Sequence, residues 1–357
     1  MSKKMLTNLV LVFVMLLTVV SVASAAPPVQ KGLTYTVKLG DNLWALAEKY
    51  LGSGLAYCAI VGATNAEYAG DSSFAHIKNP SLIQPGWKLL IPSAEEAEKY
   101  IAVAKGGQLQ LAGSTTVQPL AEQLAEAFMK LNPGVVIEVQ GGGSSVGVTS
   151  AGEGTVDIGN TSREIKSSEL EQFPNLKVFT IAYDGIAIVT HPDTKLDTLS
   201  IEQVRNIFAG EITNFSQVGG PNAPIIVVSR EEGSGTRAAF EELVMQYKDA
   251  AGETQKKVIF ERALLQQSNG QVRTAVSTTP NSIAYLSFGF LDNTIRWVPI
   301  GGVEPSVANV KNGSYTIFRP LNMLTNGAPS KLAQAFLDYI LSDDGQAIVA
   351  EKYLTVK

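Results

Sequence analysis

The chain has 357 residues, of which 45% are hydrophobic and 17% are charged, which is a globular composition with room for two or three domains. The formal net charge of −5 argues against a nucleic-acid partner, and one cysteine with two histidines supplies neither an internal disulfide nor a Cys/His metal site. A small anion remains compatible with this charge, because fixed local dipoles can bind one inside a net-negative protein.

The first residues have the layout of a secretory signal peptide. Lys3 and Lys4 precede an uncharged run over 5–22, and the small residues of 23–25 form an A-x-A cleavage site. We therefore expect residues 1–25 to be removed and the mature chain to be secreted, in the cell wall or periplasm. No cysteine lies at the cleavage point, so no lipid anchor is expected there. The alternative is an uncleaved membrane anchor, since the run is nearly long enough to span a bilayer.

Residues 33–93 show the pattern of a small complete module. A short alternating strand begins at Tyr35, and the next helix covers 42–50, with Asp41 expected as its N-cap. A second helix is expected over 57–63, and a closing strand over 88–92. The order strand, helix, helix, strand predicts a βααβ unit.

Two segments of this unit, YTVKLGDNLWALAEKYLG and NPSLIQPGWKLLIP, strongly resemble the LysM family. LysM modules bind N-acetylglucosamine-containing glycans such as peptidoglycan, so the resemblance implies a glycan partner. The two binding loops of the family fall on Gly40, Asp41, Leu43, Asn79, Pro80, Ile83 and Pro85. The segment between Asn65 and Ile77 is longer than is usual in the family, which leaves the glycan specificity open. The alternative is that Leu43, Trp44 and Ile83 only fill a small core.

The rest of the chain has the pattern of a larger α/β domain. Residues 94–106 are rich in alanine and charge and end in glycine, which is typical of a helical or flexible linker. Strands and amphipathic helices then alternate over 107–357, which predicts an α/β domain with mainly parallel strands. One of these helices is expected to place four side chains on a single face: Phe240, Leu243, Val244 and Tyr247.

Three strand–turn–helix junctions in this domain combine glycine with serine or threonine. Strands over 108–112, 135–139 and 225–228 lead into GSTT, GGGSSVG and SREEGSGTR respectively. The first amide groups of a helix have no partner within it and lie at the positive end of its dipole. Such turns gather at the carboxyl ends of parallel strands, where hydroxyl groups and Arg230 can add donors. Together they predict an oxyanion or phosphate-group site, although each junction alone is equally consistent with an ordinary helix cap.

The segments GSTTVQPLAEQLAEAF, GGGSSVGVTSAGEGTVDIGNTSREI, SREEGSGTRAAFEE and FLDYILSDDGQAIV follow one another with the order and spacing of the PstS family, which they resemble. This family is the phosphate-binding subunit of the phosphate ABC transporter. The resemblance covers about 107–357 and implies the type II periplasmic-binding-protein fold, with two lobes closing on the anion. We expect the first lobe over about 107–184 and 291–357 and the second over 185–290, with Asp184 near the hinge.

The resemblance also implies the ligand, the partners and the site. It implies a binding protein for inorganic phosphate rather than an enzyme, with ABC transporter permease subunits as partners, no cofactor and a monomeric state. Carried over position by position, the phosphate-binding residues fall on Ser114, Thr115, Thr116, Ser144, Ser145, Ser162, Arg230, Ser234, Gly235 and Thr236.

One position departs from the family pattern and bears on selectivity. Where a family member has an aspartate that accepts the proton of hydrogen phosphate, this chain has Ser162, followed by Arg163. Sulfate has no proton to donate near neutral pH, so rejecting it would fall to Ser162, a backbone carbonyl, Asp157 or Glu231. Another oxyanion, sulfate or molybdate, is therefore an alternative ligand.

Two other functions stay open. A wall-bound phosphate scavenger, sensor or adhesin is one, because a tether to the wall is unusual for a protein that delivers ligand to a membrane complex. A serine hydrolase is the other, since residues 143–147 fit the G-x-S-x-G nucleophile elbow with Ser145 as nucleophile. That reading requires a histidine base, for which His191 is the candidate.

Overall fold

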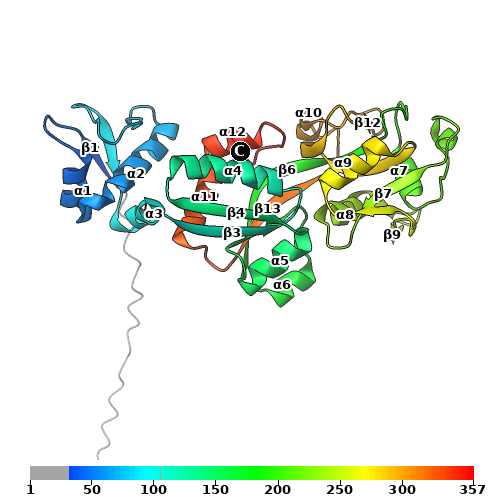
Figure 1. The fold of residues 1–357 in the computed structure, drawn as a ribbon, viewed down its shortest axis with the longest axis horizontal. Helices are drawn as coiled ribbons and strands as arrows, with labels where there is room; N and C mark the ends of the chain where they lie inside the picture. Colours follow the sequence, from blue (N-terminus) through cyan, green and yellow to red (C-terminus); the bar gives the residue numbers. More distant parts are fainter. Residues whose placement is uncertain (1–31, 105) are drawn as a thin grey trace, which may run out of the picture.

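The computed structural model describes residues 32–104 and 106–357 and shows three units in a row (Figure 1). The front module lies at one end, a first lobe lies in the middle and a second lobe lies at the other end. The predicted signal peptide, residues 1–25, lies outside the described residues. None of the helices in the described part combines the length and apolar character needed to cross a membrane.

The front module is the βααβ unit that the sequence predicts. Its elements are β1 (Leu33–Thr36), α1 (Leu43–Leu51), a 3₁₀ turn (Gly54–Ala56), α2 (Tyr57–Gly70) and β2 (Lys88–Ile91). The two strands pair antiparallel, with Leu33 opposite Ile91. Leu46, Ile60 and Leu89 are buried in the core of this unit, and burial of such side chains is the main force that holds it together.

Two details of this module differ from the prediction. Asn42, not Asp41, caps α1, because the Asn42 side-chain oxygen accepts the hydrogen bond from the backbone amide three residues on at 2.8 Å. The Asp41 carboxylate instead accepts from Lys38 N at 2.7 Å and from the Tyr35 hydroxyl at 2.8 Å. In addition, α2 is 14 residues long, so it includes the first part of the segment that is longer than usual in the family.

The first lobe is built on three parallel strands in the order β5-β3-β4. These strands are β3 (Gly107–Gly113), β4 (Val135–Gly141) and β5 (Ile158–Thr161). The helices of the lobe are α4 (Gln118–Leu131), α5 (Ser144–Glu153), α6 (Ser167–Gln172), α11 (Lys331–Ile340) and α12 (Asp343–Val349). Leu111, Leu124 and Phe336 lie in one apolar core that these elements share.

The segment 94–106, predicted as a linker, contains helix α3 (Ala94–Ala104), which contacts both of its neighbours. On one side the Tyr100 ring packs against α2. On the other side Lys99 forms an ion pair with Asp338 of α11. The connection is therefore a docked helix rather than a flexible tether.

Two long strands run between the lobes. β6 (Leu176–Thr190) and β13 (Phe318–Asn326) pair antiparallel, up to Gly185 opposite Phe318. Beyond Gly185, β6 enters the second lobe and pairs antiparallel with β11 (Ser282–Ser287) and β12 (Arg296–Val298). The prediction of mainly parallel pairing is wrong for these strands, because a strand that returns between the lobes runs against its neighbour.

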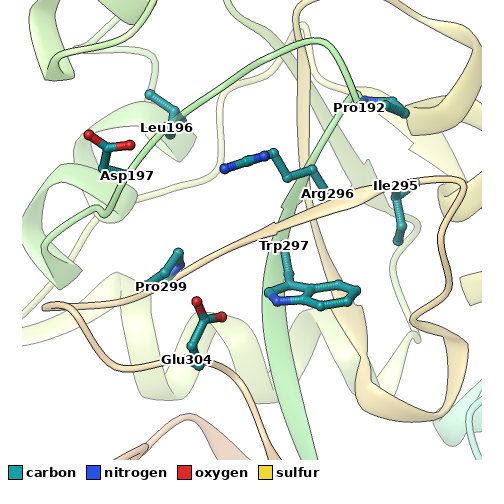
Figure 2. Close-up of a pocket in the computed structure, with 8 residues that line it drawn as sticks. All are labelled: Pro192, Leu196, Asp197, Ile295, Arg296, Trp297, Pro299 and Glu304. Atoms are coloured by element: carbon teal, nitrogen blue, oxygen red, sulfur yellow. The ribbon is translucent and has the colours of Figure 1, made fainter.

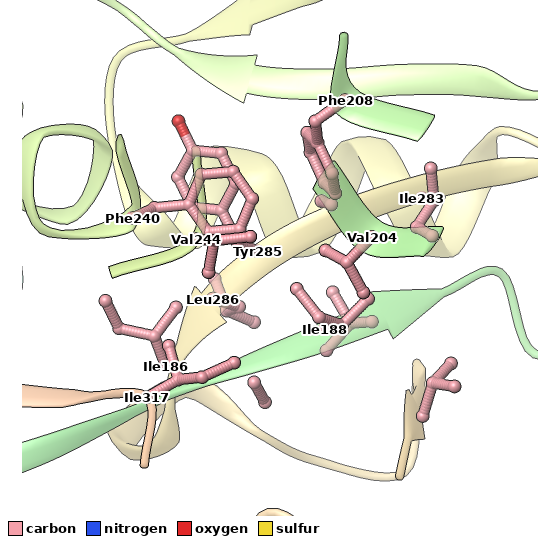
Figure 3. Packing of buried hydrophobic residues seen from close by; sticks show 14 of the residues in the cluster. Ile186, Ile188, Val204, Phe208, Phe240, Val244, Ile283, Tyr285, Leu286 and Ile317 are labelled. Atoms are coloured by element: carbon pink, nitrogen blue, oxygen red, sulfur yellow. The ribbon is translucent and has the colours of Figure 1, made fainter. Parts of the chain in front are cut away.

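The second lobe carries the other end of the same nine-stranded sheet and has its own apolar core. Its further strands are β7 (Ile226–Arg230), β10 (Leu264–Gln266) and the hairpin of β8 (Gln246–Lys248) and β9 (Thr254–Lys256). Its helices are α7 (Ile201–Phe208), α8 (Gly235–Phe240), α9 (Asn269–Thr278) and α10 (Val307–Lys311), with 3₁₀ turns at Phe215–Val218 and Phe288–Phe290. Figure 3 shows the core, where the Phe240 and Tyr285 rings stack with centroids 4.1 Å apart. Because each lobe has a separate core, the predicted two-lobed α/β architecture is confirmed.

The predicted lobe boundary after residue 290 is wrong. Ile295, Val298 and Ile317 lie in the same core as Ile186, so residues 291–317 belong to the second lobe. The physical reason is strand pairing, since β12 adds to the edge of β6 within that lobe. The chain returns to the first lobe only at β13.

The prediction of one helical face over Phe240–Tyr247 is wrong for Leu243 and Tyr247. After α8 the chain forms a π-helical turn over Glu241–Met245, and Tyr247 then lies in strand β8. Phe240 and Val244 are buried as expected, but Leu243 is 37% exposed. The change in helical pitch shifts the later side chains away from the face that a regular α-helix would present.

Candidate functional site

The three predicted junctions meet between the two lobes. The loops after β3, β4 and β5 belong to the first lobe, and the loop after β7 belongs to the second. Contact between them is direct: Ser145 N donates to Gly233 O at 3.1 Å, and the Gly143 backbone lies against Gly233. Turns at the carboxyl ends of parallel strands from both lobes thus converge on one place.

Three buried serines of the first lobe form one hydrogen-bonded group. Ser114 Oγ donates to Ser162 Oγ at 2.8 Å, and Ser162 N donates to Ser144 Oγ at 3.0 Å. Gly235 of the second lobe lies against them, and a Cβ added there would be 2.1 Å from Ser144 Oγ and 2.5 Å from Ser162 Oγ. Position 235 therefore has room only for glycine while the lobes are this close.

Buried hydroxyls also connect the lobes at Thr116. Thr116 Oγ1 lies 3.0 Å from Thr236 Oγ1 and accepts from Asn269 Nδ2 at 2.8 Å. The Ser234 hydroxyl accepts from Arg237 N at 3.3 Å and so caps α8, whose first turn contains Thr236. The capping interaction that starts this helix thereby fixes the loop that faces the first lobe.

Arg230 ends β7 and is 1% exposed. Its Nε and Nη2 donate to the two carboxylate oxygens of Glu231 at 3.0 and 2.9 Å, and Nη2 also donates to Thr115 Oγ1 at 3.3 Å. Arg230 Nη1 is buried and has no hydrogen-bond partner among the described residues. A buried cationic nitrogen without a partner is costly, so this edge of the guanidinium is suited to an anionic oxygen.

Tyr285 of β11 supports Arg230 from the core of the second lobe. Its hydroxyl accepts from Arg230 N at 3.2 Å and lies 2.8 Å from Ser229 Oγ. Burial raises the pKa of Tyr285 to about 12, so the hydroxyl stays neutral at physiological pH. The tyrosine thus fixes the strand end from which the arginine projects.

Every residue predicted for the anion site lies in this cluster or directly beside it. Most of these residues are buried, and Thr115 and Ser145 are half-buried. Of the two carboxylates proposed as proton acceptors, only Glu231 lies at the site. Asp157 is exposed before the start of β5, where it accepts from Gln110 N at 2.8 Å, so it is outside the site. Glu231 lies at the site, but both of its oxygens are bonded to Arg230.

Sequence reasoning missed Tyr285, Asn269 and Arg319, the last of which donates from Nη2 to Thr116 Oγ1 at 3.2 Å. Asn269 could have been predicted, because the residues QSNG directly follow strand β10. Ser268 there caps α9 by accepting a hydrogen bond from Gln271 N. This is a fourth strand–turn–helix junction. Tyr285 and Arg319 lie within strands, where the residue pattern indicates only a strand.

The arrangement required of a serine hydrolase is absent from the described residues. The Ser145 hydroxyl accepts from Arg163 Nη2 at 3.3 Å, not from a histidine. His191 follows the far end of β6 in the second lobe, where its Nδ1 accepts from Asp193 N at 3.2 Å. His191 is therefore not in place to activate Ser145.

The front module has a groove beside the predicted glycan loops. It measures about 280 Å³ and is lined by Asp41, Asn42, Leu43, Trp44, Tyr57, Pro80, Ser81 and Ile83. Four of the predicted residues thus line it, whereas Gly40, Asn79 and Pro85 do not. Trp44 is 53% exposed, so an aromatic side chain is available to a ligand in the groove.

A larger pocket, of about 460 Å³, opens on the second lobe around β12 (Figure 2). Figure 2 shows the Arg296 side chain extending toward Asp197, with the Trp297 ring on the other side of the strand. The remaining lining residues are Pro192, Leu196, Ile295, Pro299 and Glu304. None of the predicted site residues lines this pocket, so it is separate from the cluster between the lobes.

Comparison with known proteins agrees with this geometry. The family model of the PBP superfamily domain matches residues 101–344, and the LysM domain model matches residues 35–63. The phosphate-binding protein PstS of Bacillus subtilis is 34% identical over 67% of this chain and 77% of its own length. Among solved structures, one from Clostridium perfringens contains bound phosphate and is named after the substrate-binding proteins of phosphate ABC transporters.

That Clostridium perfringens structure is 38% identical, has a TM-score of 0.65 and covers 70% of this chain and 100% of its own. An ABC-type phosphate transport receptor from Vibrio cholerae is 30% identical, with a TM-score of 0.57, over 69% of this chain and 99% of its own. The similarity lies in the two-lobed domain, and the front module is matched separately. The chain therefore belongs to the PstS-like members of the PBP superfamily and carries an N-terminal LysM domain.

Proposed function

We propose that this chain captures inorganic phosphate between its two lobes. One observation carries the proposal: loops from both lobes bring buried hydroxyls and amides together around Arg230, whose Nη1 lacks a partner among the described residues. Donors of this kind suit a dehydrated tetrahedral oxyanion. The phosphate named for the related proteins supports the choice of ligand.

Calorimetric titration of the mature chain with phosphate and with sulfate tests this proposal. We expect one phosphate per chain, bound more tightly than sulfate. An absence of phosphate binding would overturn the proposal, and tighter binding of sulfate or molybdate would reassign the site to another oxyanion. The same preparation in gel filtration with light scattering should give the mass of a monomer.

We also infer that the LysM domain retains the protein at the cell wall. The exposed Trp44 and the groove residues Asp41, Leu43, Pro80 and Ile83 support a glycan site of the kind that binds peptidoglycan. The experiment is co-sedimentation of the mature chain with purified peptidoglycan. We expect the protein in the pellet, and recovery in the supernatant would contradict wall retention.

Delivery of the bound phosphate to an ABC importer is the function that the family membership favours. A deletion strain grown at low phosphate separates transport from scavenging or sensing. Loss of high-affinity uptake is the expected result. Normal uptake in that strain would instead favour a wall-bound scavenger or sensor that does not meet a permease.

A further inference from the structure

Arg319 lies at the hinge between the lobes and is buried with a carboxylate. It is on β13 directly opposite Asp184 on β6, at the point where the two strands pass from one lobe to the other. Arg319 is 2% exposed and Asp184 is fully buried. Arg319 Nε and Nη2 donate to Asp184 Oδ2 at 3.2 and 2.9 Å.

The remaining nitrogen of Arg319 repeats a feature of Arg230. Arg319 Nη1 is buried and has no hydrogen-bond partner among the described residues, as is also true of Arg230 Nη1. Both guanidinium groups reach the same loop, since Arg230 Nη2 donates to Thr115 Oγ1 and Arg319 Nη2 to Thr116 Oγ1. Burial lowers the pKa of Arg319, Asp184 opposes this effect, and the nearby charge of Arg230 lowers the pKa further. Because the two guanidinium groups are both positive and are buried beside the same loop, an anion next to them is favourable.

Each of the two arginines is hydrogen-bonded to one carboxylate through the same two nitrogens. Glu231 takes Nε and Nη2 of Arg230, and Asp184 takes Nε and Nη2 of Arg319. The second oxygen of Asp184 is also in use, because Oδ1 accepts from Ser287 Oγ at 2.9 Å. The carboxylates therefore orient the guanidinium groups and leave the two Nη1 edges for a ligand.

The Thr116 hydroxyl joins Arg319 to the second lobe. Its oxygen accepts from Arg319 Nη2 and from Asn269 Nδ2, so its two lone pairs are occupied. The hydroxyl proton of Thr116 must then point to Thr236 Oγ1, 3.0 Å away. The proton of Thr236 is consequently free to be donated elsewhere, which adds a donor for an anion between the lobes.

We propose that Arg319 is a second phosphate-binding guanidinium, which also holds Thr116 to Asn269 and Thr236 of the second lobe. This inference rests on the proposed function and adds a residue to its site. A guanidinium at the hinge that contacts the anion joins ligand binding to lobe closure, because the same side chain contacts Thr116 and Asp184.

The test compares loss of the Arg319 guanidinium with loss of the Arg319–Asp184 ion pair. The mature full chain is prepared as wild type, Asp184→Asn, Arg319→Lys and the double variant Asp184→Asn/Arg319→Gln, which keeps an uncharged hydrogen-bonding pair. Arg205→Gln is the matched control, since Arg205 is half-buried away from the hinge, where it donates to the Val244 carbonyl and lies over the Tyr247 ring. Phosphate affinity is measured by calorimetry, and the unfolding temperature is measured without phosphate.

We expect Arg319→Lys and the double variant to weaken phosphate binding by about tenfold or more, and Asp184→Asn to weaken it less. The double variant should melt near the wild type, since no charge is left buried alone. Phosphate binding by the double variant within about threefold of wild type would overturn the inference. If the double variant does not fold, wild-type affinity in Arg319→Lys overturns it instead. A wild type that does not bind phosphate refutes the proposed function, which is a separate result.

Discussion

At Gly235 the two lobes leave no room for a methyl group. The Cβ of an alanine would lie 2.1 Å from Ser144 Oγ, which belongs to the other lobe. We expect Gly235→Ala to weaken phosphate binding by about tenfold or more while each lobe still folds, because the clash arises only when the lobes close. Gly270→Ala is the control, since its Cβ would meet only Ser268 Oγ at 3.8 Å. Calorimetry with phosphate checks both, and unchanged binding by Gly235→Ala would show that closure is not this tight.

Arg230 gives the second prediction at the scale of the residue. Arg230→Ala should cost more than about 2 kcal/mol of phosphate binding free energy, because it removes a buried charged partner of the anion. Arg273→Ala is the matched control, as Arg273 is 38% exposed and pairs with Asp292 on the surface. A loss below about tenfold in calorimetry would remove Arg230 from the site.

Helix α6 contains a partly buried carboxylate, Glu169, whose contribution to the stability of the fold depends on pH. Glu169 accepts from Arg163 Nη1 at 2.8 Å and from Lys166 N at 3.0 Å. Burial raises the pKa of Glu169, but the hydrogen bonds from Arg163 and Lys166 outweigh it, so the net pKa lies below the ordinary value of 4.5. Such a carboxylate stabilises the fold fully above its unfolded pKa, and this contribution is lost as the pH falls through the lower folded value.

We therefore expect the unfolding temperature of Glu169→Gln to fall less than that of the wild type on acidification from about pH 6 to about pH 3. Thermal unfolding followed by circular dichroism across this range makes the comparison. Glu171→Gln is a suitable control, because Glu171 is exposed on the same helix. Parallel curves for the wild type and Glu169→Gln would contradict the account of α6.

Elements with local determinants could be predicted from the sequence, and those that depend on distant packing could not. The loops at Ser114, Ser144 and Ser234 were found because glycine and hydroxyl residues at a helix start follow from capping chemistry. Arg319 was missed, because its role depends on the register that places it opposite Asp184 across two strands. The lobe boundary was missed for the same reason, since β12 joins the second lobe by pairing with β6.

Across the whole molecule the glycan groove and the anion cluster use different units, joined by α3. Trp44 lines the groove of the LysM domain, and no residue of that groove belongs to the cluster between the lobes. We expect Trp44→Ala to reduce co-sedimentation with peptidoglycan by about tenfold, because an exposed aromatic contact is removed. Trp297→Ala is the matched control, as Trp297 is exposed in the other pocket. Both variants should bind phosphate like the wild type, and weaker phosphate binding by Trp44→Ala would contradict this separation.

The convergence of both lobes on one anion is tested most directly by a crystal structure of the mature chain grown with phosphate. We predict one tetrahedral anion within hydrogen-bonding distance of first-lobe groups at Ser144 and Ser162 and of Arg230 and Thr236 from the second lobe. Arg319 Nη1 should lie within the same distance of an anion oxygen. Phosphate bound by one lobe alone, or only in the open pocket around Trp297, would contradict the account.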